Sequence, residues 1–136
     1  MGSFSDYLEN ELLDHVFGCN TRNFTPPSNI YVALSTADPT EDGSGLAEPS
    51  GNGYTRVTTS AASWTEASSG ALDNAAAINF PEATGSWGTI THFALYDGLT
   101  VGTGNMLGYG TLTIPKAIDN GDTASFAIGA LDVSLD

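Results

Sequence analysis

The stretch from Trp87 to Asp97, WGTITHFALYD, constrains the fold more than any other part of the chain. At alternate positions one face carries Trp87, Thr89, Thr91, Phe93 and Leu95, and the other carries Ile90, His92, Ala94 and Tyr96. A strand with large apolar side chains on both faces belongs in the middle of a sheet that is covered on both sides. We therefore predict a central strand here.

A glycine-rich segment, DGLTVGTGN, follows this strand and leads into a second β-like run from Met106 to Pro115. Two such runs joined by a glycine-rich loop predict a hairpin, with a loop longer than a tight two-residue turn.

The remaining segments predict further short strands at residues 30–36, 54–60, 74–80 and 124–135. In the last of these the apolar positions change parity at Gly129, where a β-bulge is expected. Residues 37–53 form a long acidic loop. About seven strands with glycine-rich turns predict a mainly β protein, an antiparallel, jelly-roll-like β-sandwich with one N-terminal amphipathic helix.

The helix is expected from Ser3 to Phe17, because its apolar residues fall mostly at three- and four-residue spacing. Ser3 is the expected N-cap and Gly18 the residue that ends the helix. Pro26 and Pro27 then form a stiff extended linker. We predict a docking helix and arm over residues 1–23 and a β domain over 24–136, with the helix covering one sheet or docking on a neighbouring subunit.

The charge of the chain excludes some partners. Three basic residues stand against sixteen acidic ones, which gives a net charge of -13. The chain cannot neutralise phosphates or bind an anionic membrane surface, so nucleic acid and membrane are excluded as partners. Such acidity suits a partner with a basic face or a protein in salty water. No secretory signal or membrane span is visible, so we expect synthesis in a cytoplasm. Cys19 is expected to be partly buried.

Catalytic patterns are missing from the sequence. His15 and His92 lie far apart, and neither a nucleophile elbow nor a zinc-type spacing occurs. We expect no enzyme activity, no metal and no cofactor. Two alternatives stay open: Asp38, Glu41 and Asp42 could collect a calcium ion, and aromatic side chains could stack on sugars.

Several long segments together indicate a family. They are YLENELLDHVFG, FTPPSNIYVALSTADPT, GNGYTRV, NAAAINFPEATGSWGTITHFALYD and IDNGDTASFAIGALDVSLD, which cover nearly the whole chain. In this order they resemble a family of small bacteriophage virion proteins, described as tail-fibre or capsid-decoration proteins. The resemblance implies a structural protein in the virion and supplies no catalytic motif.

The leading hypothesis is a capsid-decoration (cement) protein that stabilises the head shell by binding the major capsid protein or other virion proteins. A homo-oligomer, trimer or dimer, is expected. The expected partner contacts are Phe4, Leu8, Leu12, Phe17, Pro26 and Pro27. The alternative is a tail- or head-fibre module that binds host-surface glycan. The expected glycan-facing residues are then Trp64, Trp87 and Tyr109.

Overall fold

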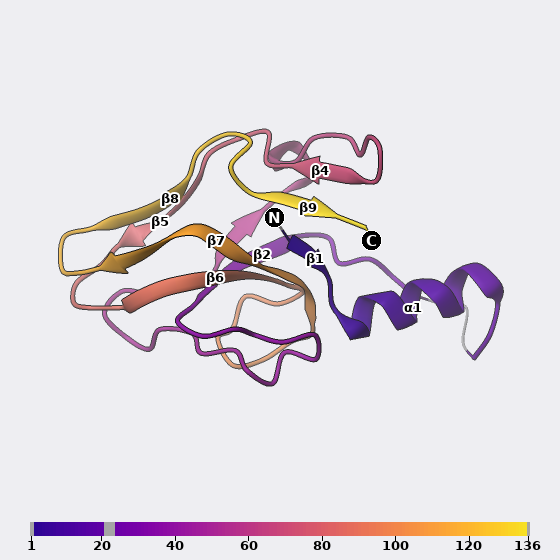
Figure 1. The fold of residues 1–136 in the computed structure, drawn as a ribbon, viewed down its shortest axis with the longest axis horizontal. Coiled ribbons are helices and arrows are strands. Elements are labelled where there is room, and N and C mark those ends of the chain that lie inside the picture. Colours follow the sequence, from indigo (N-terminus) through magenta and orange to yellow (C-terminus); the bar gives the residue numbers. More distant parts are fainter. Residues whose placement is uncertain (1, 21–23, 136) are drawn as a thin grey trace.

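The computed structural model describes residues 2–20 and 24–135. Within these ranges it contains one α-helix, α1 (Asp6–Phe17), a short 3-10 helix at Ala61–Ser63 and nine strands. The strands are β1 (Gly2–Phe4), β2 (Ile30–Ser35), β3 (Val57–Thr59), β4 (Ala71–Asp73), β5 (Ile78–Glu82), β6 (Gly88–Tyr96), β7 (Met106–Ile118), β8 (Thr123–Phe126) and β9 (Asp132–Ser134). The predicted mainly β fold with one N-terminal helix is confirmed (Figure 1).

The predicted central hairpin is present as β6 and β7. Seven strands form one curled sheet in the order β3-β2-β6-β7-β1-β9-β4, so β6 lies between β2 and β7. All neighbours in this sheet are antiparallel except β1 and β9, which run parallel. The apolar residues on both faces of β6 explain its interior place, because an edge position would leave one face exposed.

The two faces of β6 differ from those predicted by strict alternation. The pairing between β6 and β7 shifts in register between Ile90 and His92. Beyond this irregularity the side-chain direction changes, so Ile90 joins Phe93 in the main hydrophobic core, whereas Ala94 belongs to a smaller cluster on the opposite face. Assigning Ile90 to the face of Ala94 was therefore wrong, because a bulge changes which residues share a face.

The second layer is a two-stranded sheet of β5 and β8. Its side chains Ile78, Phe80 and Phe126 pack with Phe93 and Trp87 in the main core. Aromatic rings meet edge-on across this space, with the Phe93 and Phe126 ring centroids 6.1 Å apart. The main core thus lies between the large sheet and the small one.

The N-terminus differs from the prediction, because residues 2–4 form a strand and the helix begins at Asp6 rather than at Ser3. Strand β1 lies between β7 and β9, so this part of the predicted arm belongs to the sheet. Glycine allows the close approach: a Cβ on Gly108 would lie 2.6 Å from the carbonyl oxygen of Ser3. The N-cap is Ser5, whose buried hydroxyl accepts a hydrogen bond from the amide of Leu8.

The C-terminal parity change has another cause than the predicted bulge. Gly129 lies in the turn between β8 and β9, with a φ of 75° that favours glycine. Because β8 belongs to the small sheet and β9 to the large one, the chain changes layers at this turn. Its apolar positions change parity there for that reason.

Candidate functional site

Helix α1 is anchored to the sheet at its first turn. The hydroxyl of Ser5 donates to the carbonyl oxygen of Met106, and the Ser5 amide donates to the carbonyl oxygen of Leu107 at 2.9 Å. The Asp6 amide donates to the carbonyl oxygen of Glu41, at 3.0 Å, in the acidic loop. Leu8 is the buried residue of the helix. The helix then extends away from the sheet to one end of the molecule (Figure 1).

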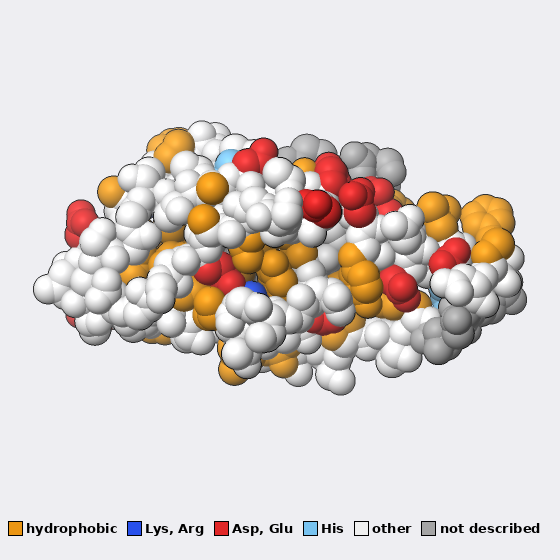
Figure 2. All heavy atoms as spheres, turned by 90° about the horizontal axis from the view of Figure 1, so that it is seen from below, with side chains coloured by type: hydrophobic (Ala, Val, Ile, Leu, Met, Phe, Trp, Pro, Cys, Tyr) orange, Lys and Arg blue, Asp and Glu red, His pale blue; other side chains and the backbone are white. Residues whose placement is uncertain are grey.

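The last two turns of α1 expose apolar side chains. Leu13 and Phe17 lie four residues apart on one side of the helix and are 57% and 72% exposed, and Val16 between them is exposed as well. Hydrophobic atoms accordingly gather at this end of the molecule in Figure 2. Gly18 ends the helix as predicted, with a φ of 72° and an amide that donates to the carbonyl oxygen of Asp14. We call Leu13, Val16 and Phe17 the helix tip.

The predicted contact residues divide into two groups. Phe4 and Leu8 line an apolar pocket of about 280 Å³ together with Ile30, Trp64 and Leu72. Leu8 is buried and Phe4 packs against the main core, so both contribute to this chain's own packing. Their role as partner contacts stays a prediction. Leu12 and Pro27 are half-buried, whereas Phe17 and Pro26 are exposed. Cys19, just beyond the helix, is exposed rather than partly buried.

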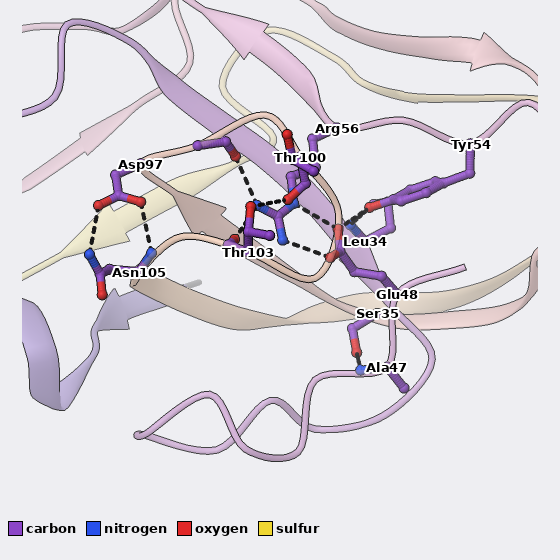
Figure 3. A network of polar contacts seen from close by, with 11 residues as sticks. Leu34, Ser35, Ala47, Glu48, Tyr54, Arg56, Asp97, Thr100, Thr103 and Asn105 are labelled. Carbon is purple, nitrogen blue, oxygen red and sulfur yellow. Dashed lines mark hydrogen bonds and ion pairs between the residues drawn. The ribbon is translucent and has the colours of Figure 1, made fainter. Parts of the chain in front are cut away.

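A buried ion pair connects the two long loops at Arg56, the residue just before β3. Arg56 forms a bidentate ion pair with Glu48, at 2.9 Å from Nε to Oε1 and 2.8 Å from Nη2 to Oε2. Its Nη1 donates to the carbonyl oxygens of Gly98 at 2.8 Å and Thr103 at 3.0 Å (Figure 3). The guanidinium also stacks 3.9 Å from the centroid of the Tyr96 ring. We call Arg56 and Glu48 the loop clamp.

Neighbouring groups complete the bonding of the clamp. The Tyr54 hydroxyl donates to Oε1 of Glu48 at 2.8 Å and accepts from the amide of Leu34 at 3.0 Å (Figure 3). Burial raises the pKa of Tyr54 well above its usual value of 10, so the phenol stays protonated and keeps donating. The loop at 97–105 is closed by Asp97, which accepts from the backbone and side-chain amides of Asn105. The acidic loop and this second loop are thus held in place.

Burial of Arg56 in the clamp leaves fewer basic side chains on the surface, so its exposed charges are mainly acidic. Arg56 is buried and paired with Glu48, so among the described lysines and arginines the exposed one is Lys116. Acidic side chains are spread over the face in Figure 2, while little of any Lys or Arg is visible there. Such a surface attracts basic groups and repels acidic ones.

The acidic loop engages its carboxylates with donors of the same chain. Asp42 accepts from the Ser44 amide at 3.0 Å and from the Thr40 hydroxyl at 2.8 Å, and these bonds, the first above all, lower its pKa to about 2. Glu41 accepts from the Tyr109 hydroxyl at 2.8 Å. Among residues 2–20 and 24–135, no group of three or more His, Cys, Asp or Glu side chains is placed to hold a metal ion.

The family comparison covers nearly the whole chain. Residues 3–134 match the model of the family described as "Podophage GP4 fiber I protein gp80". The chain belongs to this family. A search of the curated proteins finds no match.

Membership of the GP4 fiber I family makes this a fibre-type structural protein of a phage, and its place is in the virion. The predicted resemblance to small phage virion proteins is confirmed. In the described part of the chain no helix has the length and apolar character needed to cross a membrane.

In this member of the fiber I family, the aromatic side chains proposed for glycan stacking make contacts within their own chain. Trp87 is only 4% exposed and its indole N–H donates to the carbonyl oxygen of Asn52, so its assignment as a glycan-facing residue is wrong. Trp64 lines the apolar pocket and donates to the hydroxyl of Thr59 at 2.9 Å. Tyr109 is half-buried and bonded to Glu41; burial first and this bond second raise its pKa to about 12.

Sequence reasoning missed the loop clamp. Arg56 is one of three basic residues and follows Tyr54 by two positions in an alternating segment, so an inward-facing arginine could have been suspected. An inward arginine requires a buried acid, and Glu48 in the preceding loop was available. Leu13 and Val16 were also missed as surface residues, because periodicity does not say which part of an apolar stripe the fold covers.

Proposed function

We propose that this protein is a fibre-type component of the phage particle that docks by the helix tip onto another virion protein. The observation that carries the proposal is the exposure of Leu13 and Phe17 at the end of a helix that projects from the sheet. Clustered exposed apolar side chains of this kind mark interaction sites more often than single ones do. The amphipathic helix is also a common form in which one protein enters the groove of another.

The charges around the helix tip define the expected partner. Asp6, Glu9, Glu11 and Asp14 lie on the same helix, and His15 is its only basic side chain. A groove with an apolar floor and basic side chains along its rim fits this helix best. Binding to such a groove weakens as salt is added, because the charge attraction is screened.

The firm anchoring at Ser5 and Leu8 supports this role. A helix that is fixed at its base presents its tip in one orientation, so little ordering is required when a partner binds. The loop clamp holds the neighbouring acidic loop, to which the amide of Asp6 is bonded. The support for the helix therefore reaches from the clamp through the acidic loop.

The predicted head-shell decoration role, the trimer or dimer and the domain boundary at residue 23 stay predictions. The family description favours a fibre over a shell protein. Burial of Trp87 and the engaged side chains of Trp64 and Tyr109 weaken the glycan alternative. Docking by the helix tip is compatible with either place on the particle.

Virion incorporation tests the docking. Phage lacking this protein would be complemented with the wild type, with Phe17→Ser, or with Ile128→Ser as the matched control, since Ile128 is 71% exposed and lies in the turn between β8 and β9. We expect Phe17→Ser to fold normally and to be lost from particles, while Ile128→Ser is incorporated at wild-type level. Equal incorporation of the two variants would reject docking by the helix tip.

Electron cryo-microscopy of the same particles tests the position. Copies confined to projecting fibres support the fibre assignment, and hundreds of copies in icosahedral positions on the head shell would restore the decoration role. The sole cysteine, Cys19, lies exposed two residues beyond Phe17, so a thiol-directed crosslinker attached there reports which virion protein contacts the helix tip.

A further inference from the structure

Strands β7 and β8 follow one another but do not pair. The turn that joins them is short and closed by two bonds: the amide of Asp119 donates to Oδ2 of Asp122 at 2.9 Å, and the amide of Asp122 donates to the carbonyl oxygen of Asp119 at 3.0 Å. Strands joined by so short a turn ordinarily form a hairpin. Here β7 stays in the large sheet while β8 pairs with β5, so the two strands diverge from the turn (Figure 1).

A cleft of about 700 Å³ lies between the diverging strands. Its walls come from β7, with Leu112, Ile114 and Lys116, and from all of β8. Its floor includes Leu34 and Ile90, which belong to the main hydrophobic core. Ile114 is 75% exposed at this cleft. The opening therefore leads from solvent to the core between the two sheets.

Each wall of the cleft is the edge of a sheet. Strand β1 pairs with β7 only at residues 108–110, so from Thr111 onward the outer edge of β7 faces no strand among the described residues. Within the same ranges β8 has β5 as its single partner strand. An open edge offers a row of N–H and C=O groups to an incoming strand. Two such edges on one cleft match an extended backbone between them.

The edge of β7 is protected only near the turn. Pro115 lacks an N–H group and Lys116 adds a charge, and both are devices that natural sheets use against unwanted pairing. Residues 112–114 and β8 lack these devices. The open part of the cleft is therefore about as long as the four residues of β8.

We propose that this cleft is a strand-acceptor site, which takes an extended segment of another protein of the particle between β7 and β8. The inserted strand joins the large and small sheets into one, with main-chain bonds on both sides. Its alternate side chains are apolar, because they face Leu34, Ile90 and Phe126. The end that lies at the turn meets Asp119 and Asp122, and the net charge of -13 favours basic residues at both ends.

Another polypeptide suits the cleft better than a second copy of this chain. A second copy brings the same acidic charge, and its extended linker carries Pro26 and Pro27, which cannot donate main-chain hydrogen bonds. That the donor is a virion protein rests on the proposed function. The cleft itself does not, and it can be tested on the isolated protein.

The probe is a synthetic peptide with blocked ends and the sequence Lys-Val-Thr-Val-Thr-Val-Lys, titrated into isotope-labelled full-length protein and followed by amide NMR. We expect slower amide exchange at residues 112–114 and 123–126, and the largest shifts there and at Leu34 and Ile90 on the floor of the cleft. The same peptide with N-methyl groups on alternate residues should not bind, because it lacks the donors on one edge. Ile114→Lys should weaken binding about tenfold or more, because the peptide would lose an apolar contact made on binding and its lysines would meet another positive charge.

The matched control is Ile128→Lys, because Ile128 is similarly exposed and does not line the cleft. Equal binding by Ile114→Lys and Ile128→Lys, or by the N-methylated peptide, would overturn the proposal. So would peptide-induced shifts that are largest outside the residues lining the cleft. Concentration-dependent shifts at the same amides without peptide would show instead that a second copy occupies the cleft. Loss of docking in helix-tip variants would leave all these results unchanged.

Discussion

The loop clamp and the helix tip are parts of one molecule with opposite kinds of support. In the clamp, Arg56 and Glu48 are 0% and 4% exposed, and every hydrogen-bonding nitrogen of the guanidinium has a protein acceptor. In the helix, the buried contacts end at Leu8, and Phe17 is mostly in solvent. The two loops are thus fixed by a polar network, while helix α1 extends beyond the core.

This difference reverses the usual division between scaffold and contact surface. Loops ordinarily carry function on a rigid framework of helices and strands. Here Glu48 brings the acidic loop into the framework, and the same loop bonds the start of α1 through the carbonyl oxygen of Glu41. The helix is then the element free to meet a partner. Substitutions in the clamp should therefore change stability, and substitutions at the helix tip should change assembly.

The largest effect is expected from Arg56→Met, which leaves the buried carboxylate of Glu48 without its cation. Breaking a buried ion pair from one side costs about 3–5 kcal/mol in the free energy of unfolding. Equilibrium unfolding in urea measures this loss. The double variant Arg56→Met with Glu48→Leu should recover part of it, because no unpaired charge remains, although the carbonyls of Gly98 and Thr103 still lack a donor. A single variant that costs less than about 1 kcal/mol would contradict the clamp.

A smaller loss is expected from Ser5→Ala at the base of the helix. The substitution removes the cap on the Leu8 amide and the donor to the Met106 carbonyl, both buried, and should cost about 1–2 kcal/mol. Urea unfolding with circular dichroism follows both stability and helix content. Ser3→Ala is the control, because Ser3 lies in β1 and was the cap predicted from sequence. If Ser3→Ala were the costlier change, the cap would be at Ser3 after all.

A weaker, pH-dependent effect is expected where the acidic loop meets β7. The pKa of Tyr109 is raised from 10.0 to about 12, first by burial and then by its bond to Glu41. A raised folded-state pKa means that the stabilisation is present below pH 10 and is lost as the pH rises from 10 to about 12. Glu41→Gln should lower the Tyr109 pKa without restoring the ordinary value, because burial remains. Spectrophotometric titration, with Tyr109→Phe to identify the signal, measures the change; an unchanged pKa would argue against the bond.

The sequence predicted what depends on local pattern and missed what depends on distant contacts. Apolar residues on both faces identified β6, and Gly18 marked the helix end, because each property is encoded within a few neighbouring residues. The irregularity after Ile90 was invisible, since a register shift is decided by the partner strand. Strand β1 was missed because a three-residue strand is specified by the edges of β7 and β9 rather than by its own composition.

The candidate site was predictable to a similar degree. The sequence placed a docking surface on the helix but could not say where the chain's own sheet stops covering it, so Phe4 and Leu8 were grouped with Phe17. Pairing Arg56 with Glu48 needs the path of the loop between them, which sequence periodicity does not supply. The glycan-facing prediction for Trp87 was wrong for the same reason, because the burial of this apolar side chain depends on the second layer.

The smallest change in stability is expected from Phe17→Ala, and this prediction separates docking from packing most directly. At 72% exposure the ring gains little from folding, so the free energy of unfolding should change by no more than about 0.5 kcal/mol. Leu8→Ala, on the same helix but buried, should cost about 2 kcal/mol or more. Thermal and urea unfolding of the two variants give the comparison. If Phe17→Ala were as costly as Leu8→Ala, the helix tip would pack on its own chain and could not serve as a docking surface. If Phe17→Ala leaves stability unchanged but abolishes incorporation into particles, the contact of Phe17 is made with another protein. The side chain then contributes nothing to the stability of the isolated chain and is required only in the virion.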